Sequence, residues 1–86
     1  MKKISKESRD KLLNALAEQL DTRDKRYMFI RVSFGSKFLS QIQLEGTPAN
    51  TAWNIYDEFE KQGMIGSLMA CMNNCFELDL LLELVD

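Results

Sequence analysis

The chain has 86 residues, of which 45% are hydrophobic and 28% are charged, and its net charge is −2. This composition is typical of one small soluble globular domain and excludes a disordered or low-complexity chain. Without histidine, the sequence lacks the usual general base at neutral pH, and its two cysteines supply neither a disulfide framework nor a complete zinc site. We therefore expect a protein that is not an enzyme and that uses no cofactor or metal.

The longest stretch without a charge, residues 62–76, is too short and too polar to span a bilayer. The first residues lack the apolar core of an export signal, so we expect a cytoplasmic protein with no membrane partner. The apolar pattern continues to the last residue without a helix-ending signal. We interpret residues 1–86 as a single helical interaction domain trimmed from a longer protein, with a natural end as the alternative.

Two helices are predicted in the first 35 residues. Ser5 is a suitable N-cap for the first, in which leucines recur at helical spacing: Leu12, Leu13, Leu16 and Leu20. Thr22 is a suitable N-cap for the second, which ends at Gly35. Residues 27–34 are apolar nearly all round and also fit a strand, but the cap and the glycine favour a helix.

Two further helices are predicted between residues 36 and 63. Ser36 caps a short one, whose apolar positions are Phe38, Leu39 and Ile42 and which ends near Glu45-Gly46. Thr47 and Pro48 begin the next, and Gly63 follows its last turn. Its predicted buried stripe is Ala49, Ala52, Trp53, Tyr56 and Phe59. On this stripe, Trp53 and Tyr56 are expected in the core rather than as a platform for stacking bases.

The remaining chain predicts a fifth helix that ends at Asn73-Asn74 and a final segment, "CFELDLLLELVD", with two interpretations. Its leucines alternate as in a half-buried strand, but helical spacing also fits. Because the sequence shows no second confident strand to pair with it, we expect a helix. The predicted fold class is all-α, a compact antiparallel bundle of five to six short helices.

Two local patterns have both a functional and a structural interpretation. The spacing of Gly63 and Gly66 matches the GxxG loop of KH-type RNA-binding domains, but the residues between them are apolar. We interpret these glycines as a corner between helices. Cys71 and Cys75 lie four residues apart, as in some metal or redox sites, and we expect them to be small core residues.

The charges are divided between the two halves of the sequence. Residues 1–43 contain ten Lys/Arg and five Asp/Glu, whereas residues 44–86 contain one and eight. We predict a basic protein-binding surface of Arg23, Lys25, Arg26, Arg31 and Lys37. The predicted acidic surface is Asp57, Glu58, Glu60 and Asp79, with apolar contacts from Met64, Leu80 and Leu84. Contact between such different patches produces rings or open filaments. The competing hypothesis is a small nucleic-acid-binding or transcription regulatory protein that uses the same basic residues.

Two longer segments resemble effector-associated domains. In "LDTRDKRYMFIRVSFGSKFLSQI", an acid- and arginine-containing helix start leads through apolar positions to a glycine and a short Leu/Ile helix. In "TAWNIYDEFEKQGMIGSLM", a helix with an aromatic or acidic end is followed by glycine, an apolar residue and a Leu-rich helix. These segments are residues 20–42 and 51–69, about half of the chain, and the likeness extends over nearly all of it. A difference is that Asn73-Asn74-Cys75 stands where that family usually has a proline.

The resemblance implies a death-like fold and a bacterial module that pairs with itself or with like-fold domains. Such modules recruit effectors, such as proteases or caspase-like enzymes, in conflict, anti-phage or cell-death systems. The expected function is therefore that of a non-enzymatic adaptor.

Overall fold

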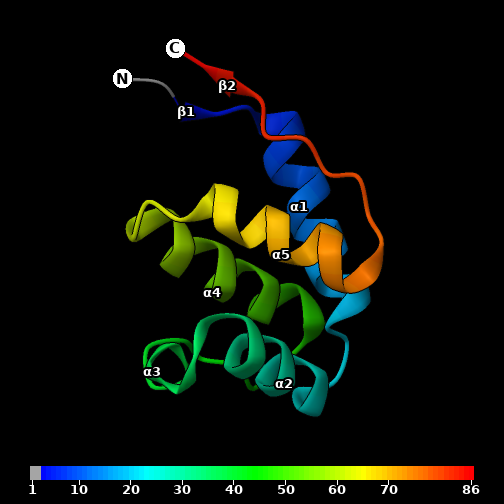
Figure 1. Cartoon of the computed structure of the whole chain (residues 1–86), viewed down its shortest axis with the longest axis vertical. Helices are drawn as coiled ribbons and strands as arrows, with labels where there is room; N and C mark the ends of the chain where they lie inside the picture. The colour runs from blue at the N-terminus through cyan, green and yellow to red at the C-terminus, as the bar shows by residue number, and fades with distance from the viewer. Residues whose placement is uncertain (1–2) are drawn as a thin grey trace.

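The computed structural model describes residues 3–86 and consists mainly of helices (Figure 1). In chain order, its elements are β1 (Lys3–Ile4), α1 (Lys6–Gln19), α2 (Arg23–Phe34), α3 (Ser36–Leu39), α4 (Pro48–Lys61), α5 (Ile65–Phe76) and β2 (Leu84–Val85). The predicted all-α bundle of short helices is confirmed, with five helices in the described residues. Met1 and Lys2, which belong to the start that we interpreted as lacking an export signal, lie outside the described residues.

Three predicted N-caps are confirmed by hydrogen bonds. The hydroxyls of Ser5, Thr22 and Thr47 each accept a bond from the backbone N–H three residues later, at 3.1, 3.3 and 3.2 Å. Each bond satisfies an N–H that has no partner within its own helix. The local sequence therefore places the starts of α1, α2 and α4 correctly.

The predicted third helix is wrong in length and in its cap. Only Ser36–Leu39 is helical, Gly35 rather than Ser36 occupies the cap position, and an irregular loop follows to Thr47. Ile42 and Leu44 are buried from this loop, while the Arg26 guanidinium binds the carbonyls of Leu44 and Gly46. A side chain of α2 thus supplies hydrogen-bond partners to two backbone carbonyls of the loop. These carbonyls therefore do not depend on the hydrogen bonds of a helix.

The core lies where α1 packs on α4 and α5. Its central side chains are fully buried, and they include Leu12, Leu16, Ile55, Phe59, Leu68 and Met72. A cluster of aromatic rings continues this core towards α2 and α3. The ring of Phe59 lies 4.5 Å from that of Phe34 and 5.0 Å from that of Phe38, between centroids.

The buried face of α4 differs from the predicted stripe at two positions. Ala49 is exposed, and Trp53 is 45% exposed instead of lying in the core. The buried positions are Thr51, Ala52, Ile55, Tyr56 and Phe59. Helix α4 is covered both by α1 and by the aromatic side chains of α2 and α3. The buried side of α4 is therefore centred nearer Ile55 than the sequence pattern predicted. Trp53 lies at its margin, edge-on to Tyr56 at 5.9 Å and beneath the Arg9 guanidinium at 5.6 Å.

The predicted last helix is also wrong. Helix α5 continues past Asn73-Asn74 to Phe76, Glu77 takes a left-handed conformation (φ 54°), and the chain is then extended to its end. Leu84 and Val85 pair antiparallel with Ile4 and Lys3, so the two ends of the chain lie side by side (Figure 1). The missing strand partner is a two-residue segment at the opposite end of the sequence, which is too short for a pattern to reveal.

Candidate protein-interaction surface

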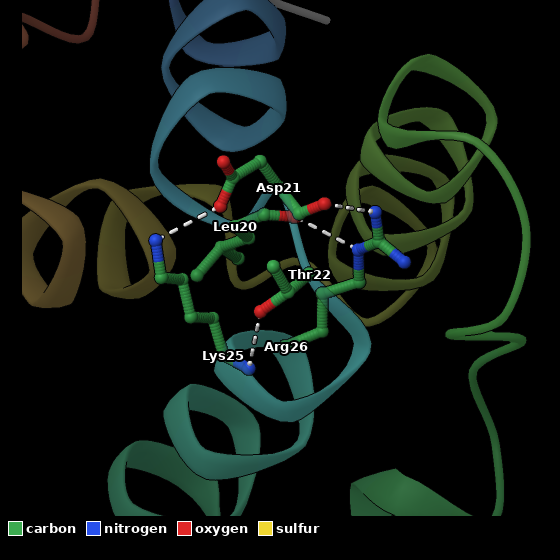
Figure 2. A network of polar contacts seen from close by, with 5 residues as sticks. All are labelled: Leu20, Asp21, Thr22, Lys25 and Arg26. Atoms are coloured by element: carbon green, nitrogen blue, oxygen red, sulfur yellow. Dashed lines mark hydrogen bonds and ion pairs between the residues drawn. The ribbon is translucent and has the colours of Figure 1, made fainter.

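Arg26, one of the five predicted basic surface residues, is not on the surface. Its side chain is 3% exposed, and its guanidinium donates hydrogen bonds to four backbone carbonyls. Two of them, Leu20 at 2.8 Å and Asp21 at 3.3 Å, are drawn in Figure 2. The other two belong to the loop before α4, Leu44 at 3.2 Å and Gly46 at 3.3 Å. The assignment of Arg26 to a binding surface is therefore corrected. This residue joins the end of α1 to the loop that precedes α4.

Arg23 and Lys25 are exposed, but each has an acidic neighbour. The Arg23 Nε–H donates to the Glu45 carboxylate at 3.0 Å, and its guanidinium lies over the Tyr27 ring at 4.6 Å. The Lys25 ammonium donates to Asp21 at 3.0 Å (Figure 2), and this bond and the lysine charge lower the pKa of Asp21. Such local ion pairs neutralise part of the positive charge that would otherwise attract an acidic partner.

Arg31 and Lys37 are exposed, and no carboxylate in residues 3–86 lies within 4.0 Å of their charged nitrogens. Arg31 lies near the end of α2, where its guanidinium is 4.0 Å from the Met28 sulfur. Of the predicted basic set, these two residues retain the charge most available to a partner.

An apolar groove between α2 and the end of α5 was missed by the sequence analysis. It has a volume of about 390 Å³ and is lined by Asp24, Lys25, Met28, Phe29, Val32, Ser33, Cys75 and Phe76. Met28 is 55% exposed and Val32 72% exposed, one helical turn apart on α2. One feature of the sequence could have indicated this groove. Residues 27–34 are apolar nearly all round the helix, so they contain more apolar side chains than one buried face can cover.

The predicted acidic surface does not form a single patch. Asp57 and Glu58 line a shallow hollow beside residues 41–43, whereas Asp79 lines another hollow between the C-terminal segment and α1. Glu60 accepts a 2.8 Å hydrogen bond from the Tyr56 hydroxyl. The structure therefore separates Asp79 from the α4 acids.

The predicted apolar contacts have different environments. Met64 and Leu80 are half-buried and pack against the core, so neither is a free contact. Leu84 is about half exposed, and its neighbours in the extended segment add further exposed apolar side chains: Leu81, Leu82 and Val85. Exposure in this segment is therefore broader than the sequence suggested.

The glycine pattern has the predicted structural role, whereas the cysteine pattern has it in part. Gly63 has a positive φ of 71° directly after α4, as expected for a helix stop, and a side-chain carbon at Gly66 would lie 3.7 Å from Leu82. Cys71 is half-buried, and burial raises the pKa of its thiol, while Cys75 is exposed in the groove. The expectation that both cysteines are core residues is thus wrong for Cys75. Within the described residues, no group of three or more His, Cys, Asp or Glu side chains is arranged to hold a metal ion.

None of the helices in residues 3–86 has the length and apolar character needed to cross a membrane. In comparisons with known proteins, no family model matches the sequence, and neither a curated protein nor a solved structure matches it.

Proposed function

We propose that the chain is a non-enzymatic adaptor domain that associates with like domains, including copies of itself. The observation that carries this proposal is the exposed face of α2, where Met28 and Val32 open onto the apolar groove beside Arg31. Protein interfaces bury apolar side chains at their centre and keep charges at their rim, and Arg and Met are enriched there. The face has this composition.

Association would concentrate whatever effector is attached to the domain. A protease or caspase-like enzyme is the effector class implied by the resemblance to effector-associated domains, as is a bacterial defence or cell-death setting. A groove of about 390 Å³ accepts only a few side chains, so a single contact would be weak. Many linked weak contacts raise the effective concentration without any new interaction, which is what an adaptor requires.

The competing function, nucleic-acid binding, has less support. Of the five basic residues, Arg26 is buried and Arg23 and Lys25 have carboxylate partners. Binding to a phosphate backbone depends on several cations that release counterions, and it weakens steeply with salt. DNA or RNA binding at low salt by the exposed cations Arg31 and Lys37 would favour this alternative.

Reversing the two most available charges tests the proposal. In Arg31→Glu/Lys37→Glu, we expect self-association to weaken about tenfold or more, because the two cations most available to an acidic partner become carboxylates that repel it. Sedimentation and light scattering over a concentration series, at low and physiological salt, measure this change. Helical content should stay the same because both side chains are exposed.

The control is Lys61→Glu, which reverses one charge at an exposed position of α4 outside the α2 face. It should associate like the wild type. Equal association by the wild type and the Arg31/Lys37 variant would show that the basic part of the α2 face is not used.

A further inference from the structure

We propose that the α2–α5 groove of one copy binds the extended residues 81–86 of a second copy, so that copies join head to tail. This inference rests on the proposed function and names the complementary surface for the α2 face. It replaces the α4 acids, which line a different hollow, as the partner of the basic rim.

The C-terminal segment has the chemistry to fill the groove. Leu81 is 72% exposed, and Leu82, Leu84 and Val85 are each about half exposed. Between residues 77 and 86 the chain contains four acids and no lysine or arginine. A segment of this kind presents apolar side chains together with carboxylates, as Glu83 and Asp86 do beside Leu84.

The groove offers the opposite combination. Met28, Val32 and Phe76 supply apolar lining, and Arg31 lies beside Met28 with no carboxylate in residues 3–86 within 4.0 Å. Asp24 and Lys25 lie at the other end of the groove, where Asp21 pairs with Lys25. The positive charge available to a partner is therefore that of Arg31, and it matches an acidic segment better than a basic or neutral one.

The C-terminal segment and the α2 side of the groove lie apart along the long axis of the molecule. The longest axis measures 35 Å, and Figure 1 shows β2 at one end of it and α2 at the other. With β2 paired to β1, residues 81–86 cannot reach the groove of their own chain. A contact between different patches set apart in this way repeats without closing a two-fold dimer and adds copies one after another.

A pair of complementary blocked variants tests this arrangement. Val32→Glu places a carboxylate in the groove, and Leu81→Glu replaces an apolar side chain of the segment with a second carboxylate, so that the two blocked surfaces repel each other; both side chains are mostly exposed, so the fold should tolerate the changes. We expect each variant alone to associate at least about tenfold more weakly than the wild type. Their mixture should form 1:1 pairs that grow no further, because only one intact groove and one intact segment can meet.

Ala49→Glu serves as the control, since it adds a carboxylate at an exposed position of α4 outside both surfaces and should associate like the wild type. Sedimentation of the 86-residue chain up to about 1 mM, the range of weak contacts, provides the measurement. If circular dichroism shows that either variant is unfolded, Val32→Ser and Leu81→Ser replace them. Cys75 provides a second measurement: because it lines the groove, association should slow its alkylation by N-ethylmaleimide.

The outcomes separate the two proposals. A wild-type chain that remains monomeric overturns self-association, and with it both proposals. A wild-type chain that associates, together with blocked variants that associate equally well or whose mixture forms no pairs, overturns the head-to-tail contact and leaves self-association in place. Paired mixtures with weakened single variants support both.

Discussion

At the residue scale, Arg26 shows how a charged side chain can serve as part of the core. Its guanidinium binds two carbonyls after α1, at Leu20 and Asp21 (Figure 2), and two more in the loop before α4. Carbonyls at the end of a helix have no partners within that helix, and a planar group with five N–H donors can satisfy several of them together. The residue therefore acts as a connector between two chain segments.

Removal of this connector should destabilise the fold. In Arg26→Met, we expect the free energy of unfolding to fall by roughly 2–4 kcal/mol, since hydrogen bonds from a charged group to four carbonyls are lost. Urea denaturation followed by circular dichroism measures the change. Arg31→Met, at an exposed site on the same helix, should stay within about 0.5 kcal/mol of the wild type. Equal stability of the two variants would contradict the structural role of Arg26.

Tyr56 should make stability depend on alkaline pH. Its burial and its hydrogen bond to Glu60 raise the pKa of the hydroxyl above its ordinary value of 10.0. Below pH 10 the hydroxyl is protonated in both the folded and the unfolded protein. Above pH 10 the unfolded chain loses the proton while the folded protein keeps it, so the free energy of unfolding falls as pH rises. The advantage of the wild type over Tyr56→Phe should be about 1 kcal/mol at pH 7. It should shrink above about pH 10, by up to about 1.4 kcal/mol per pH unit. Urea denaturation of both proteins from pH 7 to above pH 10 measures this change. A difference in the free energy of unfolding that stays constant with pH would contradict the expectation.

At the element scale, side chains of α1 and α5 hold residues 80–83 in addition to the pairing of β2 with β1. Asn73 accepts a bond from the Leu80 N–H at 2.8 Å and donates one to the Leu80 carbonyl at 3.0 Å. The Ser8 hydroxyl donates to the Leu81 carbonyl at 2.9 Å and accepts from the Glu83 N–H at 3.0 Å. These bonds supply the partners that extended backbone needs, so the segment does not have to become a helix.

Loss of the Asn73 side chain should loosen this segment. In Asn73→Ala, we expect a loss of about 1–2 kcal/mol in stability because the N–H and carbonyl of Leu80 lose their partners. Amide hydrogen exchange followed by NMR should accelerate at Leu80. The neighbouring change Asn74→Ala, at an exposed position, should leave that exchange rate unchanged. Unaltered exchange at Leu80 in the Asn73 variant would mean that other contacts hold the segment.

At the scale of the whole molecule, the division of charge along the sequence is not a division into two faces. Helix α1, in the basic half, packs on α4, in the acidic half, and β1 pairs with β2 from the other end of the chain. The ion pair of Arg23 with Glu45 also crosses the boundary between the halves. The charge of each half of the sequence therefore does not indicate where a partner of opposite charge would bind.

The sequence by itself determined the all-helical class, the starts of α1, α2 and α4, and the stops at Gly35 and Gly63. The helix starts depend on hydrogen bonds between residues three apart, and the stops depend on the backbone freedom of glycine. Both can therefore be predicted from a few neighbouring residues. Only the tertiary structure decided that Arg26 is buried and that Trp53 is exposed. It also decided that residues 77–86 are not helical and that the exposed side of α2 forms a groove with the end of α5. Each depends on partners distant in sequence, which packing selects and local pattern does not encode.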